Sequence, residues 1–396
     1  MTQFGEGVRV LQMTRQITVG LLFVVAVHLR DVLPSGVTEV LLLSALFAFV
    51  ARKVKINRYL VKLIFILLLF AFFYVLSFFV AVRHEATTLN TVFILLYGMV
   101  VFAIFFQYLE SRENNTSLII FVRVTSLLSV IYVLAWGMKI IGYSHFDGLL
   151  YIRGSNVRVM GFLNNPNYYS LSMLFSFFVS LYLFRLKQVT WICVFLISLG
   201  VIFSLSRGAI LAISLFILVT FLEKRFITNL TICIAIFILA CFSFLLYETG
   251  FAADVFTLLF GRFADSGGGA AARLSSLMLG WHSYSSDLQH FLFGVGPGNL
   301  LSLMENNPHN SFARILFESG VLGFLAYVTF ITVLLLSAIR QTLSGSAFAL
   351  GMVLSLIAFS LTNDYYLVKD FWLILALAAY CCQSGRLESG CRFGRR

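Results

Sequence analysis

Long uncharged apolar runs recur along the whole chain and limit what it can fold into. The chain has 396 residues, of which 60% are hydrophobic and 11% charged, whereas soluble domains carry about 25% charged residues. A run of about 20 apolar residues can cross the roughly 30 Å hydrocarbon core of a bilayer as one helix. The sequence therefore predicts an integral membrane protein, and it excludes a soluble enzyme, a nucleic-acid-binding protein and a secreted module.

These runs predict an all-α polytopic fold in which residues 1–396 form a single integral membrane domain of about 12 transmembrane helices. With both termini on one face of the membrane, most loop Lys and Arg residues fall on that same face. Cytoplasmic loops collect positive charge, so both termini are expected to be cytoplasmic. We expect helices at about 16–33, 37–51, 63–82, 89–108, 117–141, 168–184, 190–205, 207–222, 226–247, 312–338, 345–362 and 370–383.

The stretch 188–222 lies between two basic loops and is too long for one crossing. A single helix of that length would measure about 50 Å. The chain is interrupted at Ser204-Leu205-Ser206-Arg207-Gly208, so we expect two short helices that meet there and carry Arg207 to the outer face. An arginine at the edge of the hydrocarbon core is energetically costly, which marks Arg207 as a candidate functional residue. The alternative is that Arg207 caps carbonyl groups of the turn.

Two outer segments are long enough to be functional, about 142–167 and 248–311, and the second is the predicted large periplasmic loop. Their arginines, Arg153 and Arg158 in the first and Arg262 and Arg273 in the second, depart from the sidedness trend. In the second segment, apolar residues from Leu274 to Trp281 recur with helical period. They predict an amphipathic helix on the membrane surface, with Trp281 at headgroup level and Arg273 at its start; anchoring to lipid headgroups is the alternative role for Arg273.

Asn307-Pro308-His309 is expected to open the next helix, because Asn is a good N-cap and Pro suits the first helical position. That start would place His309 in the first turn, where the helix dipole disfavours a charged imidazole. A neutral imidazole can act as a general base; the alternative is a histidine bonded to loop backbone. Asn165-Pro166 predicts the same kind of start for the helix at 168–184.

Several arginines and one histidine on an outer face suit one kind of chemistry. Guanidinium groups bind phosphate oxygens and remain charged, and a base can activate an alcohol. The cysteines lack the paired spacing of a zinc site. Together these residues favour transfer of a group from a lipid-linked pyrophosphate to a hydroxyl, without a metal.

Several short motifs in 150–325 resemble the O-antigen ligase and O-antigen polymerase family of GT-C-type membrane glycosyltransferases. Two of the motifs are Arg207-x-x-x-Leu211 and His309-Asn310, in which ten residues separate His309 from Gly320. Arg273 and Trp281, followed by Phe293-Gly294-Val-Gly296-Pro-Gly298-Asn299, form the third. The fourth is Gly161-Phe162 before Asn165-Pro166-Asn167. The resemblance implies an inverting, metal-independent enzyme without a cofactor, which uses an undecaprenyl-pyrophosphate-linked glycan donor.

By this resemblance, Arg207 and Arg273 grip the donor pyrophosphate, and His309 is the base or orients the acceptor. Asn310 and Trp281 fall in matching stretches and are substrate-binding candidates. Charge placement alone adds three more substrate-binding candidates: Arg153, Arg158 and Arg262.

The family includes polymerases, whose acceptor is a lipid-linked repeat unit, and ligases, whose acceptor is lipid A–core. We favour the polymerase, with a chain-length regulator as a possible partner; a lipid-linked oligosaccharide flippase is the alternative of another class. The resemblance implies the bacterial inner membrane, with the active site facing the periplasm.

Overall fold

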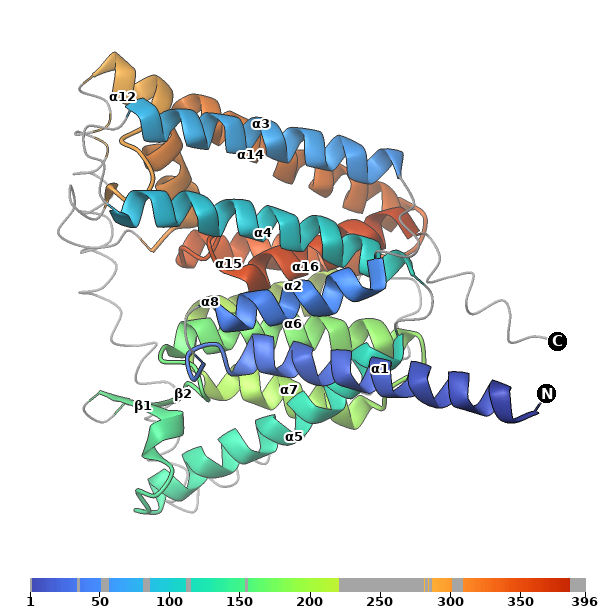
Figure 1. Cartoon of the computed structure of the whole chain (residues 1–396). Helices are drawn as coiled ribbons and strands as arrows, with labels where there is room; N and C mark the ends of the chain where they lie inside the picture. The colour runs from blue at the N-terminus through green and yellow to red at the C-terminus, as the bar shows by residue number, and fades with distance from the viewer. Residues whose placement is uncertain are drawn as a thin grey trace.

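The computed structural model is a bundle of helices with one short β-hairpin (Figure 1). It describes residues 2–33, 36–50, 57–80, 86–111, 115–153, 156–220, 281, 284, 287–300 and 309–384. The helices in these ranges are α1 (Thr2–His28), α2 (Val37–Val50), α3 (Arg58–Val80), α4 (Ala86–Glu110), α5 (Asn115–Ile140), α6 (Pro166–Arg185), α7 (Trp191–Phe203), α8 (Arg207–Thr220), α12 (Leu288–Phe293), α14 (Ser311–Leu343), α15 (Phe348–Thr362) and α16 (Lys369–Ser384).

The predicted apolar runs form helices wherever the structure describes them, which confirms the all-α class. Five of these helices, α3, α4, α5, α6 and α14, are long and apolar enough to cross a membrane. The predicted pair of short helices within 188–222 is also confirmed, as α7 and α8. The expected span at 226–247 lies outside the described residues, so the total of twelve stays a prediction.

The outward faces of the long helices carry large apolar side chains. In α3, Phe65 and Phe79 are each 70% exposed, and in α5 Leu127 is 65% exposed. The opposite side of α3 buries Phe70 and Tyr74 completely. Rows of exposed phenylalanine and leucine on several helices are unfavourable in water and favourable in lipid. With the lengths of the helices, they make the chain a multi-pass membrane protein.

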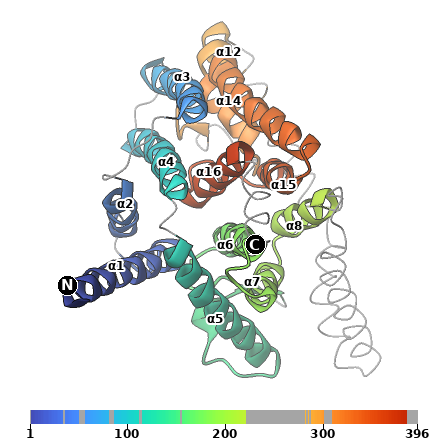
Figure 2. The same ribbon diagram turned by 90° about the vertical axis from the view of Figure 1, so that its right-hand side faces the viewer.

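Helix α6 lies at the centre of the bundle (Figure 2), where it contacts α1, α5, α7, α8 and α16. Its small residues let these neighbours approach closely. Their buried hydroxyl groups are all used: Ser176 donates to the carbonyl of Ser172, and Ser172 donates to the carboxylate of Asp370. At its start, Asn165 is the N-cap and Pro166 the first helical residue, as predicted.

A two-stranded hairpin follows α5 and a short 3-10 helix, η1 (Asp147–Leu149). Strand β1 (Leu150–Arg153) pairs antiparallel with β2 (Asn156–Val159), and Tyr151 lies opposite Arg158. This hairpin within 142–167 was not predicted from the sequence. It lies at the same end of the bundle as the starts of α6, α8, α14 and α16, here called the hairpin end, which is at the left in Figure 1. The start of α1 lies at the other end.

Helix α14 is interrupted at Gly320, whose backbone has φ 70° and ψ −179°. The interruption leaves carbonyl groups of the preceding turn without their usual helical partners. The loop after α12 supplies these: Val295 N–H donates to the carbonyl of Phe317 at 2.8 Å, and Gly296 N–H donates to that of Glu318 at 3.2 Å. Ser77 of α3 also donates to the carbonyl of Glu318. The kink therefore holds α3, α12 and α14 together at the hairpin end.

Candidate functional site

Helix α14 begins later than the sequence predicted. Its N-cap is Asn310, whose side-chain oxygen accepts a hydrogen bond from Ala313 N–H at 3.0 Å. The prediction of Asn307 as N-cap with His309 in the first turn is therefore wrong, because Asn310 takes the capping position and Ser311 is the first helical residue. His309 precedes the N-cap with φ 48°, so the argument from the helix dipole does not apply to it.

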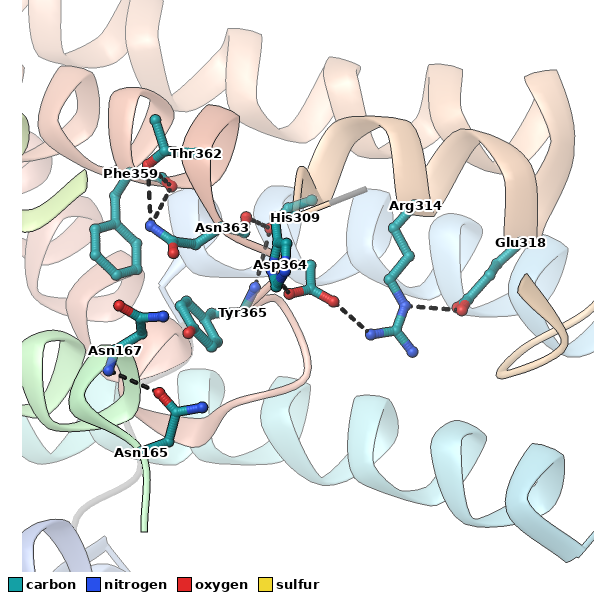
Figure 3. Close-up of polar contacts among 11 residues, drawn as sticks. Asn165, Asn167, His309, Arg314, Glu318, Phe359, Thr362, Asn363, Asp364 and Tyr365 are labelled. Atoms are coloured by element: carbon teal, nitrogen blue, oxygen red, sulfur yellow. Dashed lines mark hydrogen bonds and ion pairs between the residues drawn. The ribbon is translucent and has the colours of Figure 1, made fainter. Parts of the chain in front are cut away.

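Four charged or titratable side chains form a continuous row at the start of α14 (Figure 3). His309 Nδ1 lies 3.9 Å from Asp364 Oδ1. The other carboxylate oxygen of Asp364 accepts a hydrogen bond from Arg314 Nη1 at 2.8 Å. Arg314 Nε in turn donates to Glu318 Oε1 at 2.8 Å. His309 is thus the outermost member of a row that continues into the protein.

The outer end of this row is far more exposed than its inner end. The side chain of His309 is 43% exposed, that of Asp364 8% and that of Glu318 0%. The row holds two carboxylates and one guanidinium, so one negative charge is left beside the imidazole. The Asp364 carboxylate is therefore placed to compensate the positive charge of an imidazolium at His309.

Two tyrosines hold the inner end of the row. Tyr74 of α3 and Tyr366 both donate to Glu318 Oε2, each at 2.6 Å. Burial and then the nearby Glu318 carboxylate raise the pKa of Tyr366 well above its usual value. The phenol thus keeps its proton and remains a donor. With Arg314 on Oε1, the buried Glu318 carboxylate has hydrogen bonds on both oxygens, which a buried charge requires.

The loop between α15 and α16 is fastened to the start of α14 by backbone and hydroxyl groups. The carbonyl of Asn363 accepts from Ser311 N–H at 3.0 Å and from Ser311 Oγ at 2.8 Å. Ser311 Oγ also accepts from Tyr365 N–H at 3.1 Å. These bonds fix Asp364 opposite His309 although 54 residues separate them in sequence.

Arg207 lies at the same end of the bundle. It is the first residue of α8, directly after the turn with α7, and it is exposed. A Cβ atom on Gly208 would meet the side chains of Asn363 and Thr362, so these would have to move to admit a larger residue. The turn that carries Arg207 is therefore packed against the loop that carries Asp364.

The structure also describes three other residues that were predicted for the site: Arg158, Asn310 and Trp281. Arg158 is 5% exposed and its guanidinium donates to the carbonyl of Ser204 and to the side chain of Asn167. Asn310 uses its side-chain oxygen in the cap. The ring of Trp281 lies 5.8 Å from that of Tyr284 and is 48% exposed.

Three candidates fall wholly or partly outside the described residues. Arg262 and Arg273 lie outside, as does most of the amphipathic helix predicted from Leu274 to Trp281. For Arg153 the structure describes the backbone, which pairs with Asn156 across the hairpin, and not the side chain.

Sequence reasoning did not identify Asp364, Arg314 and Tyr366 as site residues. The pair Asn363-Asp364 in a short turn between two apolar runs was the available signal, and turn chemistry explained it adequately. Arg314 and Glu318 have the i,i+4 spacing that favours an ion pair on a helix, and the structure shows this pair.

Comparison with known families identifies one region of the chain. The family model described as O-antigen ligase matches residues 192–328, which include α7, α8, α12 and the first part of α14. A search of curated proteins finds no significant match. The family match supports a glycosyltransferase-type enzyme of O-antigen or related polysaccharide assembly. Over residues 192–328, the chain is therefore similar to the O-antigen ligase family.

Proposed function

We propose that this protein is an inverting membrane glycosyltransferase that moves a glycan from undecaprenyl pyrophosphate to a sugar hydroxyl. The observation that carries the proposal is the placement of exposed Arg207 and the His309–Asp364 pair at one end of the bundle. Gly208 brings the Arg207 turn against the loop of Asp364. A guanidinium suited to phosphate and an imidazole suited to accepting a proton, from distant parts of the sequence, thus lie at the same end of the bundle, which supports the proposal.

In the proposed reaction, the acceptor hydroxyl oxygen forms a bond to the anomeric carbon of the donor sugar. The bond from that carbon to the pyrophosphate oxygen breaks, and the pyrophosphate leaves with the electron pair. His309 takes the hydroxyl proton, and Asp364 compensates the imidazolium charge. Arg207, joined by Arg273, binds the pyrophosphate and stabilises the charge that develops on it.

We propose the polymerase reaction, in which the acceptor is a second lipid-linked repeat unit and a chain-length regulator can take part. The second candidate is the ligase reaction onto lipid A–core, which the description of the matching family favours. The two differ in the acceptor and not in the groups that act on the donor.

A lipopolysaccharide gel of a deletion strain, run beside its pool of undecaprenyl-linked glycan, separates the two reactions. Core capped with one repeat and no ladder would identify a polymerase. Bare core, with long polymer still on the lipid carrier, would identify a ligase. Unchanged lipopolysaccharide and an unchanged glycan pool would contradict both.

We also propose that the hairpin end faces the periplasm of the inner membrane and that both termini are cytoplasmic. In a background without the native cysteines, Ser144→Cys tests the hairpin end and Arg340→Cys the opposite end of α14. A membrane-impermeant maleimide applied outside the inner membrane should label Ser144→Cys alone. Labelling of Arg340→Cys instead would reverse the proposed orientation.

A further inference from the structure

Arg158 of strand β2 lies beneath the turn between α7 and α8. Its Nε donates to the carbonyl of Ser204 at 2.9 Å, and its Nη2 donates to Asn167 Oδ1 at 2.9 Å. With the residue 5% exposed, the guanidinium is directed into the protein. The guanidinium of Arg158 thus joins the end of α7 to the start of α6.

The bond to Ser204 acts on the turn that presents Arg207. Ser204 is the C-cap of α7, where exposed carbonyl groups and the helix dipole favour a cation. The next residue, Leu205, has φ 50°, a backbone conformation that is uncommon for a residue with a side chain. Such conformations persist where the surroundings enforce them. Arg158 supplies that support directly before α8 begins at Arg207.

The hydrogen bond to Asn167 connects Arg158 to the loop that carries Asp364. The side chain of Asn167 faces that of Tyr365 (Figure 3). The adjacent Tyr168 ring lies 5.1 Å from the Tyr365 ring. Tyr365 follows Asp364 directly. The same guanidinium is therefore connected to the Arg207 turn on one side and to the Asp364 loop on the other.

We propose that Arg158 is a positioning residue, which holds Arg207 in register with the His309–Asp364 pair and does not itself bind the donor. This assignment, which rests on the proposed function, differs from the expectation that Arg158 contacts substrate. A buried fork with two fixed acceptors suits positioning because its geometry is set before the donor arrives. An arginine that grips pyrophosphate would instead present its donors to the site.

A double-mutant cycle distinguishes positioning from direct contact. Purified full-length protein is assayed with lipid-linked glycan isolated from the deletion strain. Arg158→Gln should lower kcat/KM for the donor by about 10- to 100-fold, since a displacement of about 1 Å can cost about 10²-fold. In an Arg207→Gln background the same change should cost less than about threefold, because the two residues act as one unit. Equal losses in both backgrounds would overturn the proposal.

A second variant distinguishes the effect of the position of the Arg158 guanidinium from the effect of its charge. Asn167→Leu removes the acceptor for Arg158 and leaves the number of positive charges unchanged. We expect it to lower donor kcat/KM as Arg158→Gln does, although the guanidinium is intact. Lys139→Gln is the matched control, because Lys139 lies at the same end of the bundle and is paired with Asp147. Full activity of Asn167→Leu would indicate that the charge of Arg158, and not its position, is what matters.

Hydrogen exchange of the full chain in detergent tests the proposal without any activity. Arg158→Gln should speed amide exchange in residues 204–210 by about tenfold or more relative to wild type and to Lys139→Gln, because the turn loses its support. Unchanged exchange there would overturn the positioning role even if glycan transfer is confirmed. Conversely, faster exchange in a protein whose Arg207→Gln variant transfers glycan normally would leave Arg158 supporting the turn and refute the proposed function.

Discussion

Asp364 and His309 face each other across the hairpin end, with Nδ1 of the imidazole 3.9 Å from Oδ1 of the carboxylate. Arg314 holds the other oxygen of Asp364 at 2.8 Å, which fixes the direction of the carboxylate. Arg314 therefore holds the Asp364 carboxylate in place, facing the partly exposed ring of His309. In the proposed reaction, this arrangement compensates the charge of His309 when the imidazole accepts a proton.

Asp364→Asn should lower the transfer rate on the order of 10²-fold, because the variant keeps the shape of the side chain and removes the charge that compensates an imidazolium. Donor KM should change little, since Asp364 does not contact the pyrophosphate in the proposed reaction. Initial rates over a range of donor concentrations check this. Asp147→Asn is the control, and equal rates for Asp364→Asn and wild type would remove Asp364 from the mechanism.

Glu318→Ala should destabilise the fold by about 3–5 kcal/mol, because it leaves Arg314 buried without one of its two carboxylates and removes the acceptor of two buried phenols. The measurement is the free energy of unfolding of the purified protein in detergent. A loss smaller than about 1 kcal/mol would mean that water or rearranged side chains replace the carboxylate.

Gly320→Ala should be strongly destabilising, because φ 70° with ψ −179° is a conformation that essentially glycine alone adopts, at a cost of about 1–3 kcal/mol for other residues. A Cβ atom there would also meet the carbonyl of Leu292. Gly137→Ala is a matched control, since Gly137 is helical with open space around it; it should be neutral or stabilising by up to about 1 kcal/mol. Equal unfolding midpoints for the two variants would contradict this explanation.

Arg207→Lys should impair transfer while membrane insertion stays normal, because an ammonium group does not replace a planar fork that binds two phosphate oxygens. Loss of one charge-assisted hydrogen bond costs about 1.5–3 kcal/mol, so donor kcat/KM should fall by about 10- to 100-fold. We expect the same direction for Arg273→Lys. Arg340→Lys, at the far end of α14, is the control; wild-type kinetics for Arg207→Lys would exclude the proposed pyrophosphate contact.

The helices could be predicted from the sequence because bilayer thickness and hydropathy decide them locally. The turn between α7 and α8 followed from the length of 188–222, which cannot cross once, together with its two basic flanks and the interruption at 204–208. The start of α14 could not be predicted, because Asn307 and Asn310 are both acceptable caps. Hydrogen bonds from Ser311 to Asn363 accompany the later start, and they come from a distant loop.

The hairpin had a local signal that was not used. In β2, Val157 and Val159 alternate with the polar residues Asn156 and Arg158, which is the sequence pattern typical of a β-strand. The charged row had no such signal beyond the Arg314–Glu318 spacing, because Asp364 and Tyr366 reach it through tertiary packing of α14 and α16. The sequence could indicate which residues are chemically suited to the reaction, and the fold was needed to show which of them meet.

The most informative measurement is glycan transfer by purified His309→Ala compared with wild type, with the same lipid-linked donor and native acceptor. We expect transfer to fall on the order of 10²- to 10⁴-fold, the usual contribution of a general base, while the variant inserts and unfolds as the wild type does. Transfer at the wild-type rate would contradict the assignment of His309 as the base and, with it, the proposed mechanism.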